Sequence, residues 1–233
     1  MKKTNLILLM ATSVFLAASC TNAPKSYDAT TSEAKEVVAD GTAKAFKVDT
    51  SASKVEWVGT KVSGYHSGTI RLAGGELLVK DGVLTGGKFT LDMNSMNVTG
   101  PAGSNEAMNA KLLGHLTSAD FFDTAAFPDA AFEVTAIKPF SGMVAETSEE
   151  RQEDISEYKV ADPTHMISGN LTLKGVTKNI EFPARVTITE NSADAVAKFN
   201  IDRSMWNIVY PGKPDDLIRD EIHLGIALKA TML

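Results

Sequence analysis

Apolar and polar residues alternate one by one along most of the chain from Ala45 onward. In one example, Phe132, Val134 and Ala136 are separated by Glu133 and Thr135. Strict alternation is typical of strands that bury one face, which is the habit of antiparallel sheets. The pattern therefore predicts an all-β domain. Its alternating stretches are 46–48, 55–57, 89–93, 132–136, 167–173, 180–188, 195–201 and 222–230.

Turn-forming pairs separate these stretches. Asp81-Gly82, Lys174-Gly175 and Asn191-Ser192 fall at the short spacing that hairpins require. Gly74-Gly75 and Gly86-Gly87 indicate bends or bulges, which curve a sheet toward closure. About eight strands with almost no helix predict a barrel or a sandwich.

One segment, 104–116, has a helical rather than a strand period. Met108, Leu112, Leu113 and Leu116 recur at helical spacing, and Ser104 is the expected N-cap. Two interpretations remain open for this short amphipathic helix. It is either a lid or plug at a barrel mouth, or a crossover that covers a sheet edge.

Two further segments carry no apolar period. Residues 21–44 are rich in Thr, Ala, Ser, Asp, Glu and Lys, and such a composition does not offset the entropy of ordering. We therefore predict a flexible linker from Cys20 to residue 44, followed by one folded domain over 45–233. The acidic stretch from Gly142 to Asp162 is predicted to be a long surface loop.

The first twenty residues have the form of an export signal. Lys2 and Lys3 precede an apolar run from Leu6 to Ala18, which is too short to span a bilayer. The sequence's single cysteine, Cys20, follows at the position where a bacterial lipoprotein signal places its lipidated residue. We expect residues 1–19 to be removed, Cys20 to be acylated, and the protein to face the periplasm in the bacterial cell envelope. The alternative is an ordinary secretory signal that happens to contain a cysteine.

Composition excludes several classes of partner and chemistry. The net charge is −6, with 23 basic and 29 acidic residues. Nucleic-acid phosphates need clustered Lys and Arg, so we expect no nucleic-acid partner. The four histidines show no metal-ligand spacing, and no thiol remains once Cys20 is acylated. We therefore expect no metal, no cofactor and no catalytic residues.

Several residues on the inward phase of the strands are small. An eight-stranded barrel is either filled by its side chains or holds one small ligand. Small inward side chains leave room for a ligand, whereas large ones fill the lumen, and periodicity alone does not decide between these outcomes. The small inward residues are Ala136, Gly169, Ala184, Ala195, Ala197 and Ala230.

Four segments together resemble the YceI-like family of lipocalin-like polyisoprenoid-binding proteins. The most specific is His-Leu-Thr-Ser-Ala-Asp-Phe-Phe-Asp at 115–123, followed closely by Phe127-Pro128. A second is the hairpin at 169–178, and two more lie at 199–206 and 220–222. The resemblance covers about residues 45–233, the whole predicted domain.

The resemblance implies an extended, eight-stranded antiparallel barrel whose apolar lumen holds an isoprenoid or another long-chain lipid, for carriage or storage. It implies a periplasmic binding role without catalysis; the membrane anchor is expected from Cys20 alone. Two alternatives remain: a lipid-modifying enzyme in the same barrel, and a structural or stress-related lipoprotein with a filled core. Since Trp206 carries an indole N–H that needs a partner, we place it near a barrel mouth. The predicted lipid-binding residues are Phe89, Phe132, Phe182, Ala184, Ala197, Phe199, Trp206 and Leu224.

Overall fold

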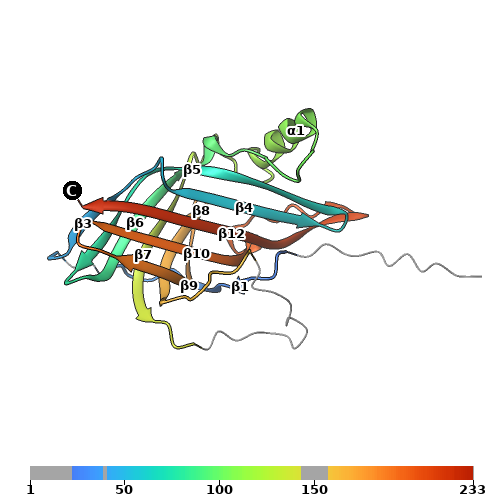
Figure 1. The fold of residues 1–233 in the computed structure, drawn as a ribbon. Coiled ribbons are helices and arrows are strands. Elements are labelled where there is room, and N and C mark those ends of the chain that lie inside the picture. Colours follow the sequence, from blue (N-terminus) through green and yellow to red (C-terminus); the bar gives the residue numbers. More distant parts are fainter. Residues whose placement is uncertain (1–22, 39–40, 143–156, 233) are drawn as a thin grey trace, which may run out of the picture.

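A computed structural model describes residues 23–38, 41–142 and 157–232; the predicted signal peptide and Cys20 lie outside these ranges. It shows a closed antiparallel barrel of eight strands, in which each strand pairs with the next and the last returns to the first (Figure 1). This confirms the all-β fold with about eight strands. The barrel strands are β4 (Lys54–Lys61), β5 (Gly64–Lys80), β6 (Val83–Asp92), β7 (Asp129–Pro139), β8 (His165–Leu173), β9 (Val176–Ile188), β10 (Ser192–Asp202) and β12 (Asp216–Met232).

The shorter elements distinguish the two ends of the barrel. At the helix end lie α1 (Glu106–Leu116), η1 (Met93–Ser95), η2 (Arg203–Trp206) and β11 (Gly212–Lys213), together with the β4–β5 and β8–β9 turns. At the far end lie the β5–β6 and β9–β10 turns and β3 (Lys44–Val48). β3 continues the wall beyond β4 by pairing with β12 and β5. No helix among the described residues is long and apolar enough to cross a membrane.

The hairpin and bulge predictions are confirmed where the backbone requires special conformations. Asp81 and Gly82 have φ of 52° and 76°, and Lys174 and Gly175 have φ of 46° and 74°. Positive φ at both central residues is the geometry of the two-residue turn that suits the twist of a hairpin. The β5–β6 register shifts at Gly74, as expected for a bulge.

A second bulge overturns one inward assignment. The β7–β8 register shifts between Val134 and Ala136. Because one extra residue in a strand moves every following side chain to the other face, Ala136 is exposed rather than inward.

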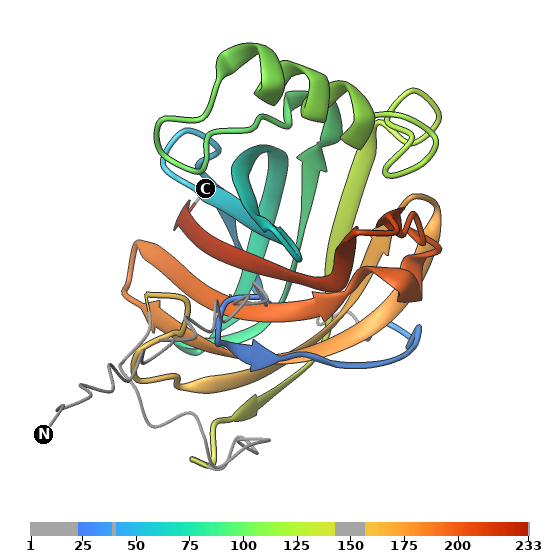
Figure 2. The ribbon, with the colours of Figure 1, turned by 90° about the vertical axis from the view of Figure 1, so that its right-hand side faces the viewer.

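The predicted helix is present, with a different cap. α1 begins after Asn105, whose side chain accepts a hydrogen bond from the Met108 backbone N–H at 3.2 Å, so Ser104 is not the N-cap. The helix lies along one edge of the barrel at this end (Figure 2). Met108, which fits the apolar stripe in sequence, is 64% exposed.

The prediction that residues 21–44 form a flexible linker is wrong for the part nearest the barrel. β1 (Tyr27–Asp28) runs parallel to β10, and β2 (Thr30–Glu33) runs antiparallel to β9. β9 and β10 pair with each other only near the far end, from Ala184 to Ile188 on β9. Toward the helix end the two strands separate and present open edges. Residues 24–35, which we call the N-terminal strap, form backbone hydrogen bonds with these open edges. The composition of the segment does not reveal this stabilisation.

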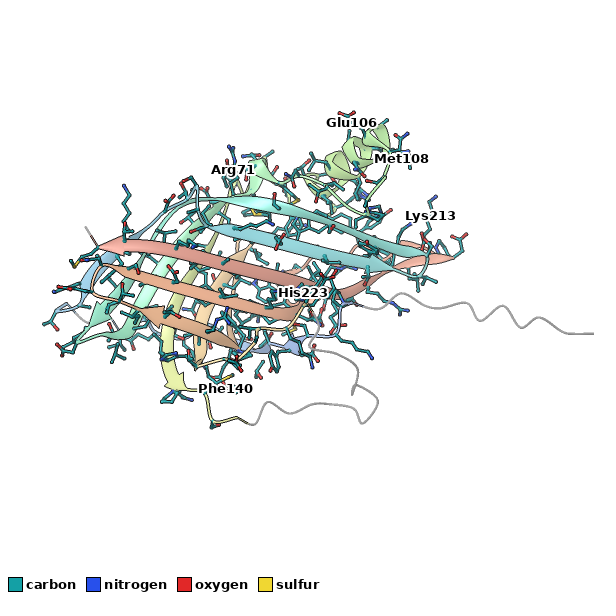
Figure 3. The ribbon with its side chains drawn as sticks, in the orientation of Figure 1. Arg71, Glu106, Met108, Phe140, Lys213 and His223 are labelled. Atoms are coloured by element: carbon teal, nitrogen blue, oxygen red, sulfur yellow. The ribbon has the colours of Figure 1, made fainter. Side chains whose placement is uncertain are left out.

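Residues 157–160, at the end of the predicted surface loop, also pack on the barrel. Residues 143–156 lie outside the described ranges. Val160 is 4% exposed, and the ring of Tyr158 meets that of His223 edge-on at 5.1 Å on the outer face of β12 (Figure 3). The Ser26 hydroxyl donates to the Tyr158 carbonyl at 2.5 Å. This segment and the strap therefore stabilise each other, and residues 158–160 of the predicted surface loop pack on the outside of the barrel.

Candidate functional site

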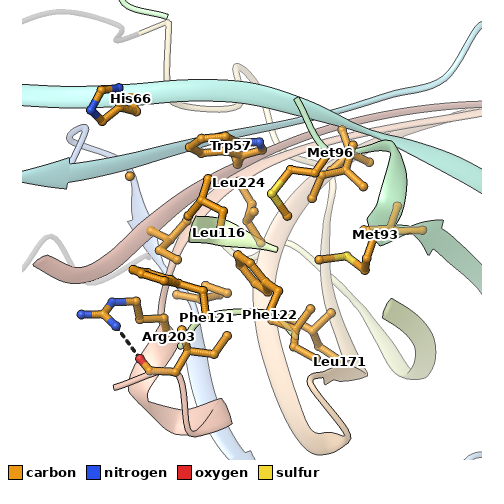
Figure 4. Close-up of a pocket in the computed structure, with 18 of the residues that line it drawn as sticks. Trp57, His66, Met93, Met96, Leu116, Phe121, Phe122, Leu171, Arg203 and Leu224 are labelled. Atoms are coloured by element: carbon orange, nitrogen blue, oxygen red, sulfur yellow. Dashed lines mark hydrogen bonds between the residues drawn. The ribbon is translucent and has the colours of Figure 1, made fainter. Parts of the chain in front are cut away.

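A cavity of about 240 Å³ occupies the helix-end half of the barrel. This volume is close to the lower end, ~300 Å³, of the range typical of small-molecule pockets. Inward residues of the barrel strands form its wall, and residues of α1 and the following turn close it (Figure 4). The strand period produces this wall directly, because every second residue of a strand faces the lumen.

Aromatic rings form a continuous surface along one side of the cavity. The ring centroids of Phe89 and Phe132 are 5.4 Å apart, and those of Phe132 and Phe182 are 5.7 Å apart. Phe182 and Phe199 stack at 4.0 Å with 13° between their planes. These separations are typical of aromatic pairs in protein cores, so the rings form a well-packed apolar surface.

Five of the eight predicted site residues line the cavity: Phe89, Phe132, Phe182, Phe199 and Leu224. Their contribution to ligand binding stays a prediction. Ala184, Ala197 and Trp206 do not line it, and the structure corrects these three assignments.

The two alanines lie beyond the stacked pair of Phe182 and Phe199, toward the far end. They are cross-strand neighbours, 2% and 5% exposed, in a part of the barrel that side chains fill. Gly169 is small for a related reason, because a Cβ there would lie 2.1 Å from the Phe132 ring. Small inward residues therefore make room for large rings here rather than for a ligand.

Trp206 has a structural role. Its side chain is fully buried, and its indole N–H donates to the Leu171 carbonyl at 3.0 Å. The expected polar partner is thus a backbone group inside the protein, and Trp206 does not lie at a mouth. Instead it fixes η2 against β8.

The sequence did not identify the residues that close the cavity. Leu112 and Leu116 of α1, with Phe121 and Phe122 of the following turn, line one side of it. The helical spacing of Leu112 and Leu116 was visible in the sequence, but it did not decide whether the helix is a lid or a crossover. The contacts with the cavity favour the lid. Met93 and Met96 at η1 add flexible side chains that adapt to irregular shapes.

Arg203 holds the loop at the helix end. It is 1% exposed and donates to the carbonyls of Ile208 at 2.5 Å and Tyr210 at 2.9 Å. It also forms an ion pair with Asp220 at 2.8 Å. Burial lowers the pKa of the guanidinium, and the charges of Asp220 and Asp202 oppose that shift. With these partners Arg203 stays charged and keeps the segment 207–210 against the cavity.

A second ion pair lies beside it. Lys61 contacts Asp216 at 2.5 Å. The hydrogen bond from Lys61, with backbone and side-chain bonds from Ser63, lowers the pKa of Asp216 to about 2. Burial, followed by the charge of Lys61, lowers the pKa of His66, so this ring is neutral at pH 7. The helix end of the cavity is therefore polar, whereas its interior is apolar.

Four buried side-chain atoms among the described residues have no hydrogen-bond partner: Trp57 Nε1, Thr60 Oγ1, His66 Nδ1 and Arg219 Nε. All four residues are among those that line this cavity. The described residues include no cluster of three His, Cys, Asp or Glu side chains that could hold a metal ion.

Comparisons with known proteins agree with this architecture. BcnA from Burkholderia cenocepacia superimposes with a TM-score of 0.59 at 20% identity, over 79% of this chain and 99% of that one. A polyisoprenoid-binding domain from Saccharophagus degradans, implicated in plant cell wall breakdown, gives a TM-score of 0.54 at 13% identity, over 82% and 99% of the two chains. At these identities the likeness is one of fold.

No curated protein sequence matches the chain. The model of the YceI-like domain, however, matches residues 46–230, which is most of the barrel and its closing strands. This match covers most of the sequence, and the eight-stranded antiparallel barrel with its apolar cavity agrees with it, so the chain belongs to the YceI-like family.

Proposed function

We propose that this protein binds an isoprenoid or another long-chain lipid inside the barrel, for carriage or storage. The observation that carries the proposal is an apolar cavity whose wall is built from Phe89, Phe132, Phe182, Phe199 and Leu224. Each buried CH₂ contributes about 0.8 kcal/mol, so ten such groups contribute about 8 kcal/mol before ordering costs. Binding of a hydrocarbon chain needs an apolar cavity of suitable shape rather than a specific arrangement of polar side chains. The Saccharophagus degradans neighbour, a polyisoprenoid-binding domain of the same fold, supports an isoprenoid as the ligand.

The cavity favours a binding protein over the two alternatives. A filled core leaves no volume of about 240 Å³. An enzyme with a hydroxyl nucleophile needs a base bonded to it. Thr60 and His66 both line the cavity, yet Thr60 Oγ1 and His66 Nδ1 each lack a hydrogen-bond partner, so they do not form such a pair.

We further propose that the protein works outside the cytoplasm, anchored by an acylated Cys20. The export signal and the position of the cysteine in the sequence support this. The anchor would lie only six residues from Ser26, which is buried against the barrel. Six extended residues reach about 20 Å, so the strap would hold the barrel close to the membrane surface.

The direct test is to purify the full chain from its native envelope, extract it with organic solvent, and identify the extract by mass spectrometry. We expect about one long-chain lipid per protein, whereas repeated recovery of none would contradict the proposal. In the same preparation, Cys20→Ser should move the protein from the membrane fraction to the soluble fraction. A variant that is exported normally and stays membrane-bound would contradict the anchor alone.

A further inference from the structure

Every buried side-chain nitrogen or oxygen atom without a hydrogen-bond partner in the described residues belongs to a residue that lines one cavity. Folded proteins satisfy nearly all of their buried polar atoms, so exceptions need an explanation. Four independent exceptions rarely gather in one place by chance. Polar groups of a ligand, or waters, in the cavity would satisfy those that face it.

Three of the four residues lie at the helix end, on β4 and the two strands that pair with it. In the β4–β5 ladder His66 is opposite Gly59, and Thr60 is the next residue along β4. Arg219 directly follows Ile218, whose partner on β4 is Lys61. The fourth, Trp57, lies three residues deeper along β4, about 10 Å at the usual strand rise. We call His66, Thr60 and Arg219 the polar trio.

The polar trio requires a partner that both donates and accepts hydrogen bonds. The Nε–H of Arg219 donates only, and the Thr60 hydroxyl does either. His66 forms a hydrogen bond to the Gly100 backbone that raises its pKa, which is donation to the carbonyl. Because Nδ1 is the nitrogen without a partner, we assign the hydrogen of the neutral ring to Nε2. In the neutral ring Nδ1 is then an acceptor and needs a donor.

Charge sets Arg219 apart from the other cations of the cavity. Lys61 is paired with Asp216 and Arg203 with Asp220. Arg219 forms no ion pair with any residue in the described ranges, although it lines the cavity and its Nε is buried. A hydrogen bond to a charged donor is stronger than one between neutral groups, so Arg219 is well suited to bind an oxygen atom of a ligand.

We propose that the polar trio binds a hydroxyl on the head group of the lipid, with the O–H donating to His66 Nδ1 and the oxygen accepting from Arg219. This inference rests on the proposed function and adds to it the ligand's chemical class and its orientation. The chain of the lipid extends from the polar trio along the rings of Phe132 and Phe182. A bare hydrocarbon would leave the trio unsatisfied.

Three probes with one chain and different heads test this inference on the full protein stripped of lipid: geranylgeraniol, its methyl ether and the corresponding hydrocarbon. The ether keeps the acceptor and loses the donor, and the hydrocarbon loses both. We expect the alcohol to bind roughly tenfold more tightly than the ether, and the ether roughly tenfold more tightly than the hydrocarbon, as befits one buried hydrogen bond at each step.

Substitutions assign each step to a residue. His66→Leu should remove the alcohol's advantage over the ether, and His66→Gln, which retains an acceptor, should restore part of it. Arg219→Met should remove the ether's advantage over the hydrocarbon. Lys213→Met is the matched control, since Lys213 is an exposed cation at the same end that does not line the cavity (Figure 3), and it should change neither ratio. Melting temperatures check that each variant is folded.

The possible outcomes separate this inference from the proposed function. Equal affinity for all three probes overturns the head-group site while lipid binding stands. If geranylgeranyl monophosphate binds more than tenfold more tightly than the alcohol, and Arg219→Met abolishes that difference, the head group is a phosphate and the hydroxyl assignment is overturned. Failure of every probe to bind overturns the proposed function together with this inference.

Discussion

Gly59 offers a test of whether the space inside the barrel is open. It lies on β4 and lines the cavity, and a Cβ added there would meet its nearest atom, Cζ3 of Trp57, at 4.0 Å. This is ordinary contact, so the position accepts a larger side chain without displacing the backbone. We therefore expect Gly59→Leu to place a leucine where a lipid would otherwise lie.

The expected change in stability follows from the added carbon atoms. Four buried carbon groups at about 0.8 kcal/mol each give an upper limit of about 3 kcal/mol in the free energy of unfolding of the ligand-free protein. Replacing glycine adds about 0.4–1 kcal/mol by restricting the unfolded chain. Ordering the leucine side chain costs about 0.5–1 kcal/mol, which offsets that gain. At about 2–4 °C per kcal/mol for a chain of this size, the melting temperature should rise by roughly 6–12 °C at most.

The assay measures two quantities in one preparation: lipid recovered per protein by mass spectrometry, and the melting temperature of the delipidated protein. Gly59→Leu should lower lipid recovery and raise the melting temperature. The matched control is Gly225→Leu on the neighbouring strand β12, where an added Cβ meets only Glu56, at 3.8 Å, and the cavity is not touched. A folded Gly59→Leu protein that retains full lipid occupancy would show that the lipid lies elsewhere. A lower melting temperature would show that the space was already filled.

Three further predictions concern packing, the strap and pH. Ala197→Phe, in the filled half of the barrel, should destabilise the protein by about 1–3 kcal/mol through overpacking; denaturant unfolding at an unchanged midpoint would contradict that assignment. Limited proteolysis should leave a fragment that begins near Pro24 rather than near Ala45, because the strap pairs with β9 and β10. Deletion of residues 24–35 removes this pairing and should lower the melting temperature. Burial lowers the pKa of His223 from 6.5 to about 4, so the ring is neutral in the folded protein. Its contribution to the free energy of unfolding is therefore complete above pH 6.5 and falls by about 3 kcal/mol at most as the pH drops to 4. Unfolding measured across that range should show a smaller loss for His223→Gln than for the wild type, and identical losses would exclude His223 as the source.

The sequence by itself determined the fold class and much of the cavity wall. Alternation with period two specifies which residues share a strand face, and this is a local property of the backbone. Phe89, Phe132, Phe182, Phe199 and Leu224 were therefore predicted as inward residues, and all five line the cavity. The hairpins at 81–82 and 174–175 were equally local, because each turn has a glycine at its second central position, where φ is positive.

Tertiary structure alone decided where the lumen is open and where it is filled. Ala197 and Phe199 share one face of β10, yet the Phe182–Phe199 stack separates the open half from the filled half. That boundary depends on rings contributed by different strands, a relation that strand period does not encode. The bulge that exposes Ala136 depends in the same way on pairing with β8.

The strap and the polar trio were also beyond the reach of the sequence. Residues 27–33 pair as strands because β9 and β10 separate and leave edges to be satisfied, and the sequence of the segment does not show which strands it meets. His66, Thr60 and Arg219 are isolated polar residues along the chain. Only the pairing of β4 with β5 and β12 brings them to one end of the cavity. Hydrogen-bond satisfaction is a property of the assembled fold, so the unpaired atoms that indicate a head-group site become visible only in three dimensions.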